Sequence, residues 1–522
     1  MRETVTQTDD RVESRREKCR FSIHPFSIHP LFVDLGLTGF TSAAVLVTSL
    51  AMVSVFGKIL GAVALAEYLL IRRMYSWLQS ATLLGIDSAL PRYVAMTDAS
   101  KPRERDSFLL AGILCGGVVV VLAFAILNGA GGTFSRWIFG AQGLRSLVLA
   151  LSLFLVGGDA HGIVYGFYRG QLAMKKANTL QVINLVVVPL GSVFALARSH
   201  STAVIVGTMG TLMILFSFLF ALPLLPQILR VARRNLRWPS KKLLEYGVPR
   251  LPSIFALGAL LALGPIAASQ KMSLTRVTPL LLGTSMLMGI AASVEPLGLI
   301  LLSKVSMFVS QNRTAELRVH LSLLQEAVVA CYAFVCLQMI VFADVVLRAW
   351  VGNRLAGGIG VVRLTLLAIP FYLLFAALRS VIDATSVTPY NTFNILISFG
   401  IFLVLLGAAA FFSPISELLW SIALAMLLAI AVLAVLTART LRKMYRLEMN
   451  WTRSISAVAI SLGLAAVSYG LRLALGREVN FASALGVGIV VTALFLFFLK
   501  RTGSPWLPFF WNLAFQRRTS DV

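Results

Sequence analysis

The longest polar stretch inside this sequence is PQILRVARRNLRWPSKKLLEYGVPR, residues 226–250. It is basic, interrupted by proline and partly amphipathic, which is typical of a cytoplasmic linker lying on a membrane surface. The chain on either side is apolar: 58% of its 522 residues are hydrophobic and only 13% are charged, and the mean hydropathy is +0.85. This composition excludes a soluble enzyme and indicates a protein that lies almost entirely within a membrane.

Hydropathy predicts about fourteen transmembrane helices, since one bilayer crossing takes about 20 apolar residues. Six precede the basic stretch and eight follow it. The predicted spans are residues 35–56, 65–88, 108–128, 144–167, 177–197, 203–225, 249–270, 277–301, 322–343, 361–384, 392–412, 417–437, 453–473 and 481–499. The sequence therefore predicts an all-α polytopic membrane protein.

The basic stretch also predicts the division of the chain. We expect a disordered cytoplasmic tail (1–30), an N-lobe of spans 1–6 (31–225), a basic cytoplasmic linker (226–248), a C-lobe of spans 7–12 (249–437), spans 13 and 14 (438–499) and a cytoplasmic tail (500–522). A faint similarity between YRGQLAMKKANTLQVIN from Tyr168 and LRSVIDATSVTPYNTFN from Leu378 favours two lobes built as parallel repeats.

The excess of basic residues predicts orientation. In a soluble protein, a formal charge of +24 would suggest nucleic acid as a partner, but in a polytopic protein basic residues mark cytoplasmic loops. With the amino terminus inside, 33 of the 46 Lys and Arg residues lie in cytoplasmic segments and 11 outside. We therefore expect a multi-pass protein of the plasma (inner) membrane with both termini in the cytoplasm, and no nucleic-acid partner.

The sequence shows no catalytic or metal-binding pattern. The duplicated FSIHP segment at 21–30 places His24 and His29 near each other, but a short duplication is more often incidental than a metal site. No Ser/His/Asp grouping, paired carboxylates or phosphate-binding glycine loop is present. We expect neither an enzyme nor a bound cofactor or metal.

Span 2 and its flanks carry a family pattern. In FGKILGAVALAEYLLIRRMYSWLQSATLLGIDSALPRYVA (56–95), a Gly-x-x-x-Gly turn and a Glu-Tyr pair lead into the span, which ends in Gly-[hydrophobic]-Asp-x-Ala-x-x-Arg-Tyr. The residues are Gly57, Gly61, Glu67, Tyr68, Gly85, Asp87, Ala89, Arg92 and Tyr93. The pattern resembles the polysaccharide-transporter (oligosaccharide flippase) branch of the multidrug/oligosaccharidyl-lipid/polysaccharide (MOP) exporter superfamily. The resemblance continues through residues 168–178, 243–253, 346–364 and 378–392.

This resemblance implies an export flippase. Its substrate would be a polyprenyl diphosphate-linked oligosaccharide, moved from the inner to the outer leaflet by alternating access in cell-surface polysaccharide biosynthesis. The implied fold is two six-helix lobes around a central cavity, followed by two carboxyl-terminal helices. The expected partners are this lipid-linked substrate, membrane lipids, and the glycosyltransferases and polymerase of the same pathway. A proton or cation gradient is the expected energy source.

Three alternatives remain. A multidrug or cation antiporter of the same superfamily would share the fold, but the charge inside span 2 is cationic, which disfavours a cationic substrate. A membrane glycosyltransferase or polymerase would be expected to have a long polar loop outside the membrane, and every predicted outside loop is short. A non-transporting scaffold would keep the fold and lose the charged cavity.

Arg72 and Arg73, inside predicted span 2, are the strongest candidates for a substrate site. A charge at this depth is costly, and guanidinium groups bind phosphate oxygens bidentately. Adjacent residues point about 100° apart on a helix, so we expect one of the two to face a cavity squarely. Alternatively, both extend to the outer interface beside Tyr75 and Trp77.

Charged residues in span 4 and at the inner ends of spans form the remaining candidates. Asp159 and His161 suggest ion coupling, with structural hydrogen bonds as the alternative. Arg169 and Arg379 lie where a lipid diphosphate would first dock. Asp87, Arg92, Glu295 and Asp383 are candidates for a cytoplasmic gate, although Arg379 and Asp383, spaced i,i+4, are expected to pair structurally.

Overall fold

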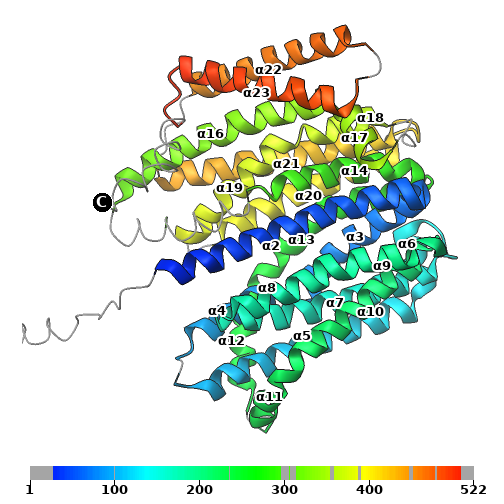
Figure 1. Ribbon diagram of the computed structural model, residues 1–522, viewed down its shortest axis with the longest axis vertical. Helices are drawn as coiled ribbons and strands as arrows, with labels where there is room; N and C mark the ends of the chain where they lie inside the picture. Colours follow the sequence, from blue (N-terminus) through cyan, green and yellow to red (C-terminus); the bar gives the residue numbers. More distant parts are fainter. Residues whose placement is uncertain are drawn as a thin grey trace, which may run out of the picture.

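The computed structural model describes residues 28–506, except 99, 234, 295–304, 306–312, 353–357, 386–388, 446–450 and 477–478. Within these ranges the chain forms helices and no strands (Figure 1). The first half comprises α2 (Ile28–Val55), η1 (Phe56–Leu60), α3 (Ala62–Thr82), α4 (Ile86–Met96), α5 (Pro102–Gly129), α6 (Gly131–Phe139), α7 (Arg145–Gly170), α8 (Met174–Val182), η2 (Ile183–Val187), α9 (Val188–Leu196), η3 (Ala197–Ser199), α10 (Thr202–Ala221), η4 (Leu222–Leu224), α11 (Leu225–Val231), α12 (Arg237–Gly247) and η5 (Val248–Arg250). The second half comprises α13 (Leu251–Ser269), α14 (Leu274–Ala291), α16 (Thr314–Val341), α17 (Ala343–Val351), α18 (Ile359–Leu366), α19 (Ile369–Thr385), α20 (Tyr390–Phe412), α21 (Leu418–Tyr445), α22 (Trp451–Ala474) and α23 (Phe481–Arg501).

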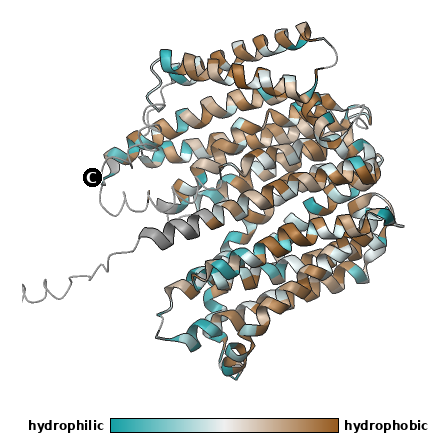
Figure 2. Ribbon diagram, in the orientation of Figure 1, coloured by the Kyte–Doolittle hydropathy of each residue, from teal (hydrophilic) through white to brown (hydrophobic). Residues whose placement is uncertain are grey.

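The predicted all-α polytopic fold is confirmed. In the described part of the chain, 13 helices are long and apolar enough to cross a membrane, and each corresponds to one of the predicted spans. The remaining predicted span, α3, is more polar because Glu67, Arg72 and Arg73 all lie within its 21 residues. It still packs inside the bundle, against α7, α13 and α14. Hydrophobic residues cover most of the helix lengths, and many hydrophilic residues lie near the helix ends (Figure 2).

The helices form two groups that meet along α3, α13 and α14. We call residues 28–231 the N-lobe and residues 251–445 the C-lobe; they occupy the lower and upper parts of Figure 1. In the N-lobe the buried helix α7 packs against α4, α5 and α10, and in the C-lobe α21 packs against α18, α19 and α20. The hairpin of α22 and α23 lies at the edge of the C-lobe, where α22 packs on α16. We call the end of the bundle opposite Ile28 and Trp506, the first and last described residues, the far end.

The basic stretch between the lobes is helical. It forms α11 and α12, and α12 continues through η5 into α13, so that Arg237–Ser269 is one helical segment of 33 residues. Pro249 and Pro252 each lie in the first turn of a helical element, where a missing N–H is tolerated. The second half of the predicted linker therefore extends the first helix of the C-lobe.

Predicted span 2, residues 65–88, ends too late. Helix α3 stops at Thr82, Leu84 and Gly85 take the left-handed conformation (φ +52° and +70°), and α4 starts at Ile86. A glycine in this conformation commonly ends a helix, and the break is also a point of tertiary contact: a Cβ atom at Gly85 would lie 2.8 Å from the Cα of Gly247, at the end of α12. Two glycines thus allow the break in the N-lobe to touch the helix that leads into the C-lobe.

Replacement of Gly247 with alanine is expected to destabilise the protein by about 1–3 kcal/mol, because the new Cβ would overlap the carbonyl oxygen of Leu84, a backbone atom that cannot rotate away. The apparent unfolding midpoint in detergent should fall. Gly463→Ala in α22, where the added Cβ meets open space, should leave the midpoint unchanged or slightly higher. Equal midpoints for wild type and Gly247→Ala would show that this contact is looser than described.

Candidate functional site

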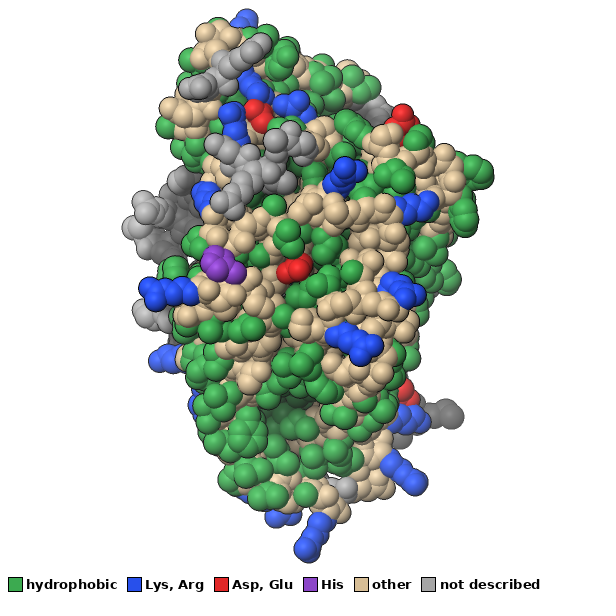
Figure 3. All heavy atoms as spheres, turned by 90° about the vertical axis from the view of Figure 1, so that its right-hand side faces the viewer, with side chains coloured by type: hydrophobic (Ala, Val, Ile, Leu, Met, Phe, Trp, Pro, Cys, Tyr) green, Lys and Arg blue, Asp and Glu red, His purple; other side chains and the backbone are tan. Residues whose placement is uncertain are grey.

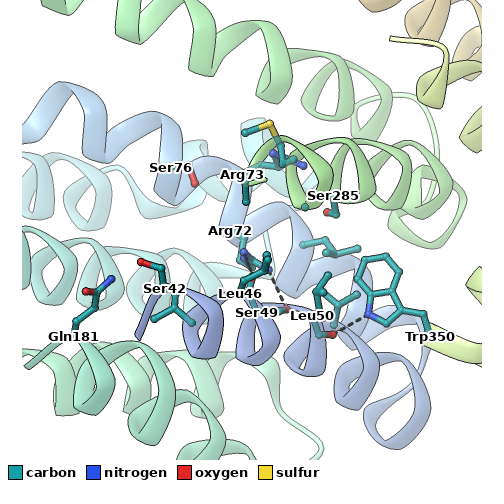
Figure 4. Close-up of a pocket in the computed structure, with 16 residues that line it drawn as sticks. Ser42, Leu46, Ser49, Leu50, Arg72, Arg73, Ser76, Gln181, Ser285 and Trp350 are labelled. Carbon is teal, nitrogen blue, oxygen red and sulfur yellow. Dashed lines mark hydrogen bonds between the residues drawn. The ribbon is translucent and has the colours of Figure 1, made fainter. Parts of the chain in front are cut away.

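A cavity of about 290 Å³ lies between the lobes. Its walls come mainly from α2, α3 and α14, with Gln181 of α8 and Trp350 of α17 at its edges (Figure 4). Its lining residues are Ser42, Val45, Leu46, Ser49, Leu50, Val53, Leu69, Arg72, Arg73, Ser76, Gln181, Ser285, Met288, Gly289, Ala292 and Trp350. The polar side chains among them are four serines, one glutamine, one tryptophan and two arginines, so the described part of the lining contains no carboxylate.

Arg72 is held by uncharged groups. Its guanidinium donates a 2.6 Å hydrogen bond to Ser49 Oγ on α2, and it lies 5.8 Å from the ring centre of Tyr68, one helical turn away. Tyr68 in turn stacks on Phe56 of η1, with ring centres 4.1 Å apart. These contacts fix the position of the guanidinium, and no carboxylate of the described residues pairs with its charge.

Arg73 lines the same cavity and has no hydrogen bond or ion pair with any residue that the structure describes. Arg72 likewise has no carboxylate partner in the described ranges. Each charge at span depth costs about 2.5–3.5 kcal/mol on insertion scales. Two adjacent guanidinium groups without a counter-ion among the described residues form a site that favours an anion.

Both arginines lie at the middle of α3. Ten residues of helix, about 15 Å, separate Ala62 from Arg72, so the pair lies well inside the helix. Both side chains reach the cavity wall, although one was expected to point away. The reason is that the cavity extends around α3, between α2 on one side and α14 on the other.

Contacts between the lobes close the cavity at the far end. Trp350 Nε1 of α17 donates to the carbonyl oxygen of Leu50 on α2 (2.8 Å), and Lys58 Nζ of η1 donates to the carbonyl oxygen of Ala349 (2.6 Å). Gly57 also packs directly against Val351. Helix α17 therefore seals the space beside the arginine pair against α2 and η1.

A second set of far-end contacts joins α6 to the end of α13. Gln270 Nε2 donates to the carbonyl oxygen of Trp137 (2.6 Å), and Ser269 Oγ donates to that of Ile138 (3.0 Å). Both carbonyls belong to α6 of the N-lobe. These contacts with backbone atoms do not require a particular side chain on α6.

Arg379 and Asp383 pair within α19, as their spacing predicts, with 3.8 Å between Nε and Oδ2. Asn391 also donates to Asp383 (2.7 Å). Neither Arg169 nor Arg379 lines the cavity. Both therefore lie apart from the site formed by Arg72 and Arg73.

The other residues predicted for a cytoplasmic gate are not joined by ion pairs in the described structure. Arg92 packs over the ring of Tyr246 (5.0 Å), and Arg169 over that of Tyr165 (5.5 Å). Asp87 makes no ion pair with a described basic residue. Glu295 lies outside the described residues.

Asp159 and His161 lie in the buried centre of the N-lobe, away from the cavity lining. His161 Nδ1 is 3.2 Å from Asn184 Nδ2, and Asn184 donates to Ser217 Oγ (2.9 Å). These contacts match the structural hydrogen bonds that were the alternative to ion coupling for His161. Asn184 belongs to the π-helical turn η2, a feature that is frequent at functional sites.

The carboxylate of Asp159 is fully buried, and its oxygens accept no hydrogen bond of good geometry from the described residues. The polar side chains of Gln79 and Thr82 on α3 lie beside it. An unpaired carboxylate in an apolar core requires compensation, by a proton or by a bound cation. Asp159 is therefore the stronger of the two predicted coupling residues.

Two groups of membrane-length helices with a cationic cavity between them, closed at the far end, define the architecture of this membrane protein. No protein-family model matches the sequence, and no curated protein matches it at the sequence level. The structure, however, is similar to solved transporters.

A lipid II flippase, MurJ, in an inward closed conformation, superposes with a TM-score of 0.65 at 14% identity, over 90% of this chain and 99% of that one. An inward-facing multidrug resistance MATE family transporter of the MOP superfamily gives 0.61 at 13% identity, over 77% and 94%. The eukaryotic MATE transporter AtDTX14 gives 0.57 at 14% identity, over 82% and 99%. The chain therefore has the fold of MOP-superfamily transporters, as its sequence resemblance implied.

Proposed function

We propose that this protein is an export flippase for a polyprenyl diphosphate-linked oligosaccharide. The observation that carries the proposal is the pair Arg72 and Arg73, two cations without a carboxylate partner among the described residues, on the wall of a cavity whose described lining contains no carboxylate. A diphosphate supplies the negative charge and the acceptor oxygens that two guanidinium groups can bind. The serine hydroxyls and Gln181 supply hydrogen-bonding groups suited to a sugar.

The size of the cavity supports a compact head group. Ligand pockets usually measure about 300–1,000 Å³, and this cavity, at about 290 Å³, is at the lower limit. In the state with the far end closed, it suits the diphosphate and the adjacent sugar, and any further sugars would extend away from the closed far end. Glycosyltransferases would supply this substrate at one leaflet, and a polymerase would consume it at the other.

The second candidate function is antiport of an amphipathic cation, which two of the similar structures favour at the level of fold. Asp159 is the observation on its side, because a buried carboxylate can bind a cation or a proton. The lining arginines oppose it, since a cationic substrate would be repelled by both. A scaffold without transport is disfavoured because it has no need of two costly intramembrane charges.

We further propose that the protein lies in the plasma membrane with both termini in the cytoplasm. The support is the distribution of basic residues: the segments predicted to be cytoplasmic contain three times as many Lys and Arg residues as those predicted to lie outside. In this orientation the far end faces outward, and the described conformation is closed to the outside.

Binding measurements on the purified protein distinguish the two functions. Farnesyl diphosphate should raise its thermal unfolding midpoint, while farnesol, which lacks the phosphates, should not. Tetraphenylphosphonium, an amphipathic cation, should bind weakly or not at all. Stabilisation by tetraphenylphosphonium alone would overturn the flippase proposal in favour of the antiporter.

We propose that a proton gradient drives transport through Asp159. Asp159→Asn, which keeps the shape and removes the charge, is expected to abolish stimulation of transport by a proton gradient while leaving exchange down the substrate gradient. The matched control is Asp106→Asn, a second buried carboxylate of the N-lobe, which lies near the basic residues Arg105 and Arg230. If the Asp159 variant retained full stimulation, the coupling residue would have to be sought elsewhere.

A further inference from the structure

Three arginines converge on one carboxylate at the far end of the C-lobe. Arg472 NH2 of α22 lies 2.7 Å from Asp344 Oδ2, Arg348 NH2 of α17 lies 3.2 Å from the same oxygen, and Arg363 NH2 of α18 lies 3.5 Å from Oδ1. Figure 3 views this face and shows Lys and Arg side chains grouped around an acidic one near the top. The cluster joins three helices that are separate in the sequence.

The cluster carries more positive charge than the carboxylate can neutralise. None of the three arginines pairs with a second described acidic residue, so two positive charges are left in excess. Arg363 makes no hydrogen bond with a described residue, and its Nε is shielded from solvent without a partner. Three guanidinium groups offer fifteen N–H donors, of which the described contacts use only a few.

Anchoring of the α22–α23 hairpin explains only part of this arrangement. Arg472 alone bonds both Asp344 and the carbonyl oxygen of Val341, which ties α22 to α17 and to the end of α16. Arg348 and Arg363 belong to the C-lobe itself, so their contacts with Asp344 do not hold α22 in place. Their side chains remain 43% and 39% exposed, so both are accessible to a ligand.

The position of the cluster is that of lipid head groups. Arg348 and Arg472 lie in the last turns of α17 and α22, and Arg363 lies one turn from the start of the span Ile359–Asp383. Apolar side chains next to Arg472 face outward, with Leu471, Leu473 and Leu475 all exposed. A cation at the end of a lipid-facing apolar surface meets the phosphate of a lipid whose chains lie on that surface.

We propose that Arg348, Arg363 and Arg472 form a binding site for the phosphate group of an anionic membrane lipid, separate from the central cavity. The lipid phosphate neutralises the excess charge and accepts the free donors of Arg363, while Asp344 holds the three guanidinium groups in place. The proposal does not rest on transport, because it concerns only lipid bound at the outer edge of the C-lobe.

The test compares wild-type protein with the double variant Arg348→Gln/Arg363→Gln, which leaves the anchoring pair of Arg472 and Asp344 intact. Binding of phosphatidylglycerol to the detergent-purified full chain is measured by native mass spectrometry. We expect the variant to bind phosphatidylglycerol at least about ten-fold more weakly than wild type, because at least one charge-assisted contact is lost. The matched control, Arg145→Gln/Arg276→Gln, removes two exposed far-end arginines that lie outside the cluster and should bind as wild type.

Two further probes identify the source of the phosphate. Dioleoylglycerol, which has the chains without the phosphate, should bind equally weakly to all three proteins, and inorganic phosphate should not displace phosphatidylglycerol at comparable concentration. If inorganic phosphate alone bound and depended on the two arginines, the site would be one for free anions and the lipid assignment would be overturned. Equal phosphatidylglycerol affinity in wild type and the double variant would overturn the site altogether.

Discussion

Replacement of both cavity arginines, Arg72→Ala with Arg73→Ala, is expected to lower the rate of substrate translocation about a hundred-fold. Each charge-assisted hydrogen bond contributes about 1.5–3 kcal/mol, which is about ten-fold or more in affinity, and the variant loses at least one such bond from each guanidinium. The rate is measured with purified protein in proteoliposomes and a diphosphate-linked oligosaccharide. Folding should be preserved, because neither charge is paired with a described carboxylate.

Two controls separate recognition of the diphosphate from the effect of total charge. Arg145→Ala/Arg276→Ala removes the same number of charges at exposed far-end positions and should transport normally. Arg72→Lys/Arg73→Lys keeps the charge but loses the forked geometry, so an intermediate rate is expected. A wild-type rate in the double alanine variant, with equal amounts of inserted protein, would remove the pair from the substrate site.

Locking the far end is expected to stop transport completely. A Cβ atom at Gly57 would lie 3.0 Å from the Cβ of Val351 in the opposite lobe, so a shift of about half an ångström gives disulfide geometry. In a background without the native cysteines, Gly57→Cys/Val351→Cys should form a disulfide under oxidation and lose all translocation. A reducing agent should restore it, because alternating access requires these elements to separate.

The matched control is a disulfide within one lobe. A Cβ at Gly283 would lie 2.8 Å from the Cβ of Thr365, and both residues belong to the C-lobe. Oxidised Gly283→Cys/Thr365→Cys should therefore keep transport. If the cross-linked Gly57–Val351 protein transported as fast as its reduced form, the contact between η1 and α17 would not be a gate.

The helices were predictable because their signal is local. Runs of about 20 apolar residues identify spans without knowledge of their neighbours, and the charges of Arg72 and Arg73 stand out within such a run. Hydropathy did not find the end of span 2, since the apolar run continues through Leu83 and Leu84; the break there packs against Gly247, more than 160 residues away.

The rest of the candidate site depends on contacts between distant segments. Ser49 and Trp350 are unremarkable in the sequence, and their roles follow only from the packing of α2 against α3 and α17. The i,i+4 spacing of Asp344 and Arg348 is visible in the sequence, but the contacts of Asp344 with Arg363 and Arg472 on two other helices are not. Apart from the two arginines, hydroxyl residues within an apolar span, such as Ser42 and Ser49, were a further sign of a polar cavity.

Translocation itself tests the central claim most directly, that the cationic cavity carries a diphosphate-linked substrate. Purified wild-type protein in proteoliposomes is given a fluorescent oligosaccharide on a polyprenyl diphosphate, and in parallel the same oligosaccharide on a neutral lipid. We predict movement between leaflets of the diphosphate-linked form alone. Transport of tetraphenylphosphonium with no movement of the diphosphate-linked form would contradict the proposal and identify a cation antiporter.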